Sequence, residues 1–122
     1  MSPSAEPEVV VQRQLDAYNG RNLGELLAVY APDASLWEHP NRLVAQGADA
    51  LRERFAARFA EPNLHAHLRQ RMVMGNFVVD HETVTRTFPE GPGTLELIML
   101  YEVRDGRIAQ AWSLIGPKRL DL

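Results

Sequence analysis

The sequence contains no cysteine. This absence excludes disulfide bonds, thiolate zinc sites, iron–sulfur clusters and cysteine nucleophiles. The chain also lacks any stretch that approaches the roughly 18 apolar residues of a membrane-spanning helix, and its start has neither the basic nor the apolar region of a signal peptide. We therefore expect a cytoplasmic protein that does not bind or cross a membrane.

Basic residues are few and scattered along the chain. The 13 Lys and Arg residues are outnumbered by 16 Asp and Glu residues, so the net charge is −3. Nucleic acid is not an expected partner, because its recognition needs a positive face that displaces counterions from phosphates. A hydrophobic fraction of 45% in 122 residues is typical of a globular protein. We expect one domain over residues 1–122, with residues 1–8 as a flexible N-terminus.

Helical patterns occupy the first half of the chain. Apolar residues at helical spacing predict one helix over residues 9–18 and another over residues 49–60. Between them, Asn22 and Glu25 form a capping-box pattern, which predicts a short helix that ends before Pro32. The first half therefore supplies three helices.

Strand patterns dominate the second half. Segments that alternate in polarity cover residues 64–74, 77–88, 94–103 and 107–115, after a shorter pair at 34–38 and 42–46. Turn residues separate the long segments at 75–76, 91–93 and 105–106, of which Asp105-Gly106 is the strongest hairpin signal. Three helices followed by an antiparallel meander predict an α+β fold in which the helices cover one face of the sheet.

Several short segments resemble those of one known superfamily. They are Leu15–Asn22 (LDAYNGRN), Tyr30–Ala34 (YAPDA), Gly47 before the third helix, and Tyr101–Ile108 (YEVRDGRI). With the order of elements, they resemble the nuclear-transport-factor-2-like superfamily, in particular its SnoaL-like and ketosteroid-isomerase-like branch. The resemblance covers nearly the whole chain. It implies a cone-shaped, cystatin-like α+β roll that encloses an apolar cavity, and a homodimer formed through the outer face of the sheet.

The resemblance also implies positions for a proton-transfer site. His39, which precedes Pro40, matches the general base of the family's steroid isomerases, and Glu38 takes that position if the register slips by one residue. The two positions that hold the oxyanion donors in those enzymes carry Gln14 and Met99. An enolate in an apolar cavity needs strong donors, so this pattern does not favour steroid isomerisation in the form those enzymes use.

The candidate site residues have both a functional and a structural interpretation. An imidazole can act as a base near neutral pH, which makes His39 the first catalytic candidate and Glu38 the second. Tyr18 lies one helical turn after Gln14 and can offer its hydroxyl to the cavity as a weak acid, although a tyrosine on a helix is often a core residue. The expected ligand-binding residues are Gln14, Trp37, Phe55, Phe59, Met99 and Tyr101.

A His-x-His pair is a candidate metal-binding motif. His65 and His67 point to one face of an expected strand, and we expect Arg69 and Arg71 to continue that face, where two cations disfavour a divalent ion. His81 is expected in an exposed turn. We expect neither a metal nor another cofactor.

Two functions from different classes remain open at this point. One is a cofactor-independent isomerase, lyase or cyclase-like enzyme in which His39 transfers a proton on a hydrophobic carbonyl compound. The other is a non-catalytic dimeric protein that binds a hydrophobic ligand or acts as an accessory protein. A dimerisation module whose cavity is filled by its own side chains is a third possibility, and the sequence does not decide among them.

Overall fold

The computed structural model describes residues 6–121, so most of the expected flexible segment 1–8 lies outside the described residues. Three helices are present in this range, as the sequence predicts, and they are α1 (Pro7–Asn19), α2 (Leu23–Ala28) and α3 (Ala48–Phe59). The side-chain oxygen of Asn22 accepts a hydrogen bond from the backbone N–H of Glu25 at 3.1 Å. This contact caps the first turn of α2.

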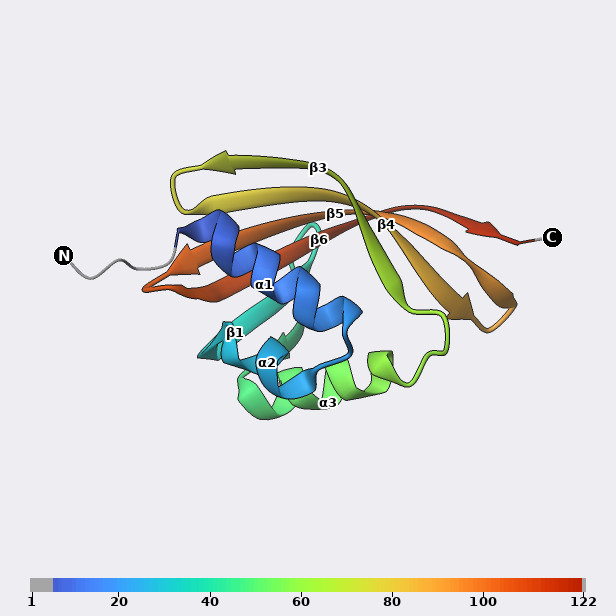
Figure 1. Ribbon diagram of the computed structural model, residues 1–122, viewed down its shortest axis with the longest axis horizontal. Helices are drawn as coiled ribbons and strands as arrows, with labels where there is room; N and C mark the ends of the chain where they lie inside the picture. The colour runs from blue at the N-terminus through green and yellow to red at the C-terminus, as the bar shows by residue number, and fades with distance from the viewer. Residues whose placement is uncertain (1–5, 122) are drawn as a thin grey trace.

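Six strands of the described part of the chain form one sheet (Figure 1). They are β1 (Tyr30–Glu38), β2 (Arg42–Gln46), β3 (His65–Met74), β4 (Phe77–Phe88), β5 (Gly91–Arg104) and β6 (Arg107–Leu120), in the order β2-β1-β6-β5-β4-β3. The expectation of a purely antiparallel sheet is wrong, because β1 pairs with β6 in parallel. That pairing joins two segments far apart in the chain. Because no hairpin turn connects them, the sequence contains no local signal that predicts the pairing.

The short second helix ends earlier than the sequence suggests. It stops at Ala28, and the chain is already extended at Tyr30, so Pro32 lies within β1 instead of ending the helix. The pairing of β1 with β6 is interrupted between Tyr30 and Ser35. Pro32 is tolerated there because a proline has no N–H to give to a sheet.

The hairpin turns are only partly as predicted. Asp105 and Gly106 connect β5 to β6 with positive φ angles of 54° and 76°, as an Asp-Gly hairpin turn requires. The predicted position of the turn between β4 and β5, at residues 91–93, is wrong. Phe88 pairs with Gly91, so the turn is Pro89-Glu90 and begins two residues earlier. This difference changes which side chains of β4 face the inside of the fold.

A bulge changes the facing of side chains along β3. Leu68 pairs with Glu82 and Gln70 with His81, so Arg69 is an extra residue between them. Beyond it, Arg71 is opposite Asp80 on the inner face of the sheet. The expectation that Arg71 shares a face with His65 and His67 is therefore wrong.

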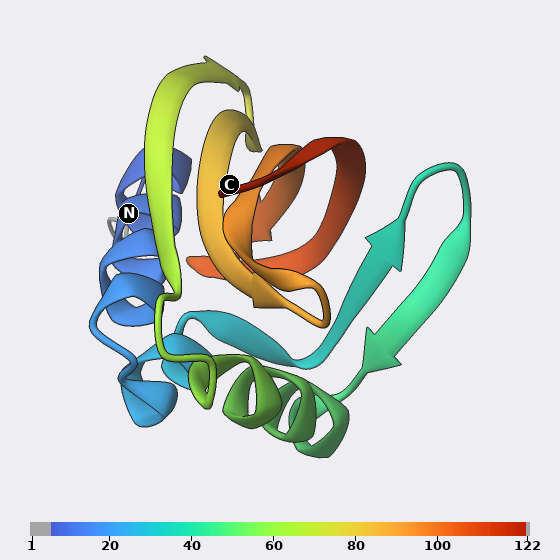
Figure 2. The same cartoon turned by 90° about the vertical axis from the view of Figure 1, so that its right-hand side faces the viewer.

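The sheet curls strongly, and the helices cover its concave face (Figure 2). The core lies between these layers and includes side chains that are almost completely buried, namely Val10, Val11, Leu26, Leu51, Val78 and Ile108. The result is the cone-shaped α+β roll that the resemblance implies. No helix within residues 6–121 has the length and the apolar character needed to cross a membrane.

Candidate functional site

A cavity of about 270 Å³ lies between the helices and the inner face of the sheet. Much of its wall is apolar and comes from α3, β5 and β6, with Phe55, Leu97, Met99 and Ile115 among the contributors. Pockets that bind small molecules are typically apolar with a few polar groups at fixed positions. The polar groups of this cavity fall into an acidic cluster, a group of tyrosines and a group of arginines.

The acidic cluster centres on Glu82 in β4. Its side chain lines the cavity, and the residue is only 5% exposed. Burial and the neighbouring Asp80 raise the pKa of Glu82 to about 7, while Arg71 opposes the rise. A carboxyl group with this pKa can both accept and return a proton near neutral pH.

Asp80 is fully buried next to Glu82 and is held by Arg71. The Arg71 Nε and Nη2 atoms donate to the two carboxylate oxygens of Asp80 at 2.7 and 2.9 Å, and Nη1 donates to Gln12 Oε1 at 2.8 Å. The bidentate geometry fixes the ion pair. The charge of Asp80 is thus compensated by Arg71. Glu82 is the carboxyl group of this cluster that faces the cavity.

Three tyrosines, Tyr18, Tyr30 and Tyr101, also line the cavity. The Tyr101 hydroxyl donates to Gln14 Oε1 at 3.3 Å, and Gln14 is also a hydrogen-bond partner of Tyr30. Burial raises the pKa of Tyr18 to about 12 and also raises the pKa values of Tyr30 and Tyr101. All three hydroxyls are therefore neutral and can act as hydrogen-bond donors.

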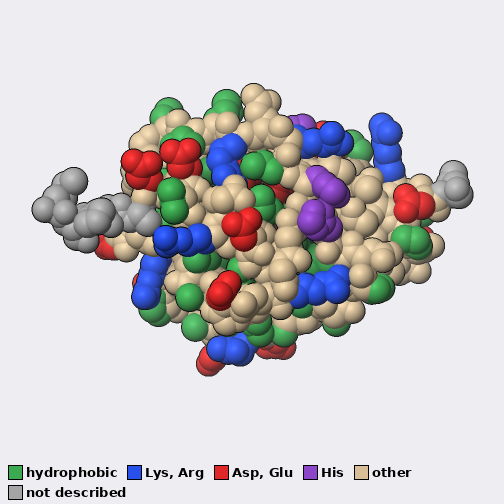
Figure 3. All heavy atoms as spheres, in the orientation of Figure 1, with side chains coloured by type: hydrophobic (Ala, Val, Ile, Leu, Met, Phe, Trp, Pro, Cys, Tyr) green, Lys and Arg blue, Asp and Glu red, His purple; other side chains and the backbone are tan. Residues whose placement is uncertain are grey.

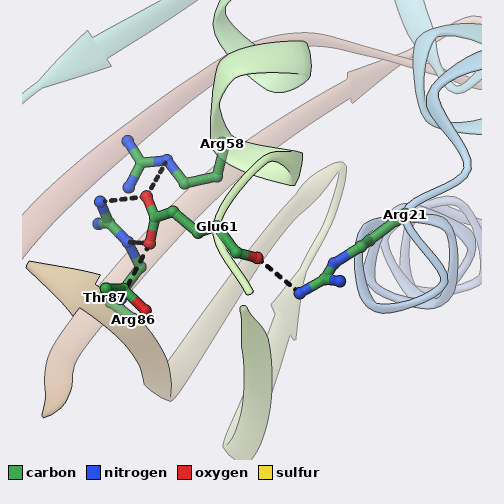
Figure 4. A network of polar contacts seen from close by, with 5 residues as sticks. All are labelled: Arg21, Arg58, Glu61, Arg86 and Thr87. Atoms are coloured by element: carbon green, nitrogen blue, oxygen red, sulfur yellow. Dashed lines mark hydrogen bonds and ion pairs between the residues drawn. The ribbon is translucent and has the colours of Figure 1, made fainter. Parts of the chain in front are cut away.

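Arginines line another part of the cavity. Arg54 and Arg58 come from α3 and Arg86 from β4. Arg86 binds the Glu61 carboxylate through two hydrogen bonds of 2.7 and 2.8 Å, as Figure 4 shows. The backbone N–H of Thr87 also donates to this carboxylate at 3.1 Å.

The structure brings most of the sequence-predicted site residues to the cavity. Those that line it are Gln14, Tyr18, Trp37, Glu38, Phe55, Met99 and Tyr101. His39 is exposed at the end of β1 and is not among the lining residues, and its backbone N–H donates to the Ser113 carbonyl at 2.7 Å. Phe59 lies behind the wall, where its ring meets that of Tyr18 at 5.8 Å between centroids.

Glu82 and Asp80 were not singled out from the sequence, because residues 80–82 were expected in an exposed turn. They lie in the middle of β4. A hairpin centred on residues 91–93 would place Glu82 opposite Glu102 on the outer face, whereas the turn Pro89-Glu90 places it opposite Leu97 on the inner face. Proline followed by an acidic residue at the turn was the signal that could have found this site.

The predicted histidine pair lies on the other side of the sheet. His65 and His67 are exposed opposite Thr85 and Thr83, with their ring centroids 4.5 Å apart. Figure 3 shows histidine side chains at the surface of the molecule, most of them in one group. Within residues 6–121, no group of three His, Asp or Glu side chains has the arrangement of a metal site.

Comparison with known proteins identifies the family. The model of the SnoaL-like domain matches residues 11–111, which is most of the chain. The chain belongs to the SnoaL-like family. No match is found among curated proteins. This SnoaL-like chain is thus a cavity protein of the nuclear-transport-factor-2-like superfamily.

Solved structures agree with this assignment. A cystatin-fold protein from Novosphingobium aromaticivorans is 19% identical, with a TM-score of 0.81 over 88% of this chain and 97% of that one. A candidate polyketide cyclase from Sinorhizobium meliloti is 27% identical, with a TM-score of 0.71 over 86% and 93% of the two chains. An LEH-like epoxide hydrolase from M. tuberculosis is 14% identical, with a TM-score of 0.79 over 91% and 83%. These likenesses support the shared fold.

Proposed function

We propose that this SnoaL-like protein is a cofactor-independent isomerase or cyclase-like enzyme that transfers a proton next to a carbonyl group of a hydrophobic small molecule. The observation that carries the proposal is Glu82, a carboxyl group with a pKa of about 7 that faces a largely apolar cavity. The likeness to a candidate polyketide cyclase supports a cyclic ligand that carries carbonyl groups.

The proposed reaction uses Glu82 first as a base and then as an acid. Its carboxylate removes a proton from the carbon beside the carbonyl, and the electron pair moves to the carbonyl oxygen to form an enolate. A neutral tyrosine hydroxyl donates a hydrogen bond to this oxygen. Tyr18 is our candidate donor, because the hydroxyl of Tyr101 already donates to Gln14. Protonated Glu82 then returns the proton to carbon. The protons and electrons of the reaction therefore balance without a redox partner or a metal.

This proposal moves the role of the base away from His39. The imidazole of His39 is exposed, whereas Glu82 is buried and lines the cavity. Exclusion of water there strengthens hydrogen bonds and favours proton transfer to a positioned base. Glu38 also lines the cavity, but its Oε1 accepts a hydrogen bond from the exposed Arg42 at 3.3 Å. We therefore keep His39 and Glu38 as rivals in the experiments.

The pH dependence of proton exchange tests this function. We expect the protein to exchange α-protons of cyclic ketones for deuterium in D₂O, with a rate that rises through a midpoint near pH 7 and then levels off. The rise has this sign because the base form of Glu82 is the carboxylate, which becomes populated above its pKa. Proton NMR of a panel of one- to four-ring ketones measures the rate. Binding of these ketones without exchange at any pH would favour the non-catalytic ligand-binding role instead.

We also propose that the protein is a homodimer formed through the outer face of the sheet. An apolar row crosses this face, where Met72, Val79, Leu100 and Trp112 pair in turn across four strands. In the neighbouring row, Ile98 and Leu114 are 38% and 46% exposed. Contiguous exposed apolar side chains of this kind mark interaction surfaces.

The oligomeric state can be tested by one substitution on this face. Analytical ultracentrifugation is expected to give the mass of two chains for the unmodified protein and of one chain for Ile98→Glu, because a charge would be buried at the interface. Val9→Glu is a matched control, since Val9 is similarly exposed at 41% but lies on α1. A monomeric unmodified protein would contradict the proposal.

A further inference from the structure

The charges that line the cavity are unevenly distributed. Three arginines, Arg54, Arg58 and Arg86, lie on its wall, and the nearest carboxylate to two of them is Glu61. Glu61 can compensate one positive charge. An excess of positive charge therefore remains at this part of the cavity.

Glu61 is already used by Arg86. Both of its carboxylate oxygens accept hydrogen bonds from Arg86, and one also accepts the Thr87 N–H. The approach of Arg58 to this carboxylate is from Nε, at 4.0 Å, which exceeds hydrogen-bond distance (Figure 4). Within residues 6–121, the guanidinium of Arg58 makes no hydrogen bond, although its side chain is only 25% exposed.

An arginine in this state is unusual for a structural role. Half-buried guanidinium groups are normally paired with a carboxylate, because removing their charge from water is costly. Burial and the like charge of Arg86 lower the pKa of Arg58, which is the response expected where positive charge is incompletely compensated. A planar guanidinium with free N–H groups matches the two oxygens of a carboxylate.

We propose that the ligand of this cavity is a hydrophobic carboxylic acid, whose carboxylate binds Arg58 while the rest of the molecule extends past Tyr18 toward Glu82. This inference rests on the proposed function for the reacting end of the ligand only. Tyr18, Arg58 and Glu82 line the same cavity, and the charges of both Arg58 and Glu82 act on the Tyr18 hydroxyl. One molecule can then be held at its acid end and react at its carbonyl end.

A pair of isosteric probes tests the carboxylate preference without any turnover. We expect 2-naphthoate to bind at least about tenfold tighter than the neutral 2-naphthamide at pH 8 and low salt, as one charge-assisted hydrogen-bonded pair provides. Isothermal titration calorimetry measures both affinities. The preference is expected to disappear in Arg58→Met and to return in part in Arg58→Lys, which restores the charge but not the planar fork.

The matched control is Arg52→Met, because Arg52 is an exposed arginine of α3 that does not line the cavity. We expect this variant to keep the preference for 2-naphthoate. Equal affinity of the two probes, no binding of 2-naphthoate, or a preference that survives Arg58→Met would each overturn the inference. A preference that persists while ketone exchange fails would instead reject only the proposed proton transfer.

Discussion

Replacement of Glu82 by glutamine is expected to lower the rate of α-proton exchange by about 10²- to 10⁴-fold, the usual contribution of a positioned general base. The amide keeps the size and shape of the side chain but cannot accept the proton. The pH dependence near 7 is expected to disappear with it, because the group that titrates there is gone. Exchange rates of unmodified and variant protein with the same ketone, measured between pH 5 and 9, check this result.

The rival bases provide the comparison. His39→Ala and Glu38→Gln are expected to change the exchange rate far less than Glu82→Gln, because neither side chain shares the burial of Glu82. If His39→Ala abolished exchange and Glu82→Gln left it intact, the base would be the exposed histidine at the end of β1. Ketone binding should survive in Glu82→Gln, which separates loss of chemistry from loss of the cavity.

The same variant should be at least as stable as the unmodified protein at pH 8. The pKa of Glu82 is raised from 4.5 to about 7 in the folded state, so the unfolded chain loses this proton first as the pH increases. The free energy of unfolding therefore falls by about 3 kcal/mol as the pH rises between these two pKa values. Urea unfolding at pH 8 measures the gain. An inactive but destabilised variant would indicate misfolding instead.

The second large effect is expected at Arg71. Arg71→Met should lower the free energy of unfolding by about 3–5 kcal/mol, because it leaves the buried Asp80 charge without its partner. This is a large part of the 5–15 kcal/mol that is typical of a whole domain. The substitution should also raise the midpoint of the exchange profile, since Arg71 holds down the pKa of Glu82.

An exposed ion pair gives the control for this experiment. Arg42 and Glu38 lie 3.3 Å apart with side chains 72% and 35% exposed, so Arg42→Met should cost less than about 1 kcal/mol. Urea unfolding followed by tryptophan fluorescence at one fixed protein concentration compares the two variants. Equal losses in both would show that the Arg71 pair behaves as a surface contact.

Local signals were sufficient to predict the elements of the fold. The Asn22 cap, the Asp105-Gly106 turn and the apolar spacing of the helices each act over a few residues, and the sequence displays them directly. The parallel pairing of β1 with β6 depends on contacts between distant segments. No turn or spacing encodes that contact, so only the family resemblance pointed to the overall shape.

The site was harder to predict than the fold. Met99 and Tyr101 were expected among the ligand-binding residues, and both line the cavity. Glu82 was missed because residues 80–82 were expected in an exposed turn, whereas they lie within β4 and the register with β5 places the Glu82 side chain on the inner face. Burial then determines its pKa, and burial is a property of the assembled layers.

The extra residue in β3 allows one strand to carry two unrelated sets of side chains. Counting along an ideal strand, positions 65, 67, 69 and 71 have the same parity and would all face outward. The bulge at Arg69 reverses the parity, so that the histidines face out while Arg71 meets Asp80 inside. In an alignment with a related chain that lacks the bulge, a one-residue gap at Arg69 keeps Arg71 at an inward-facing position opposite Asp80. A gap placed after Arg71 would instead assign Arg71 to the outer face, so the position of the gap matters more than its length.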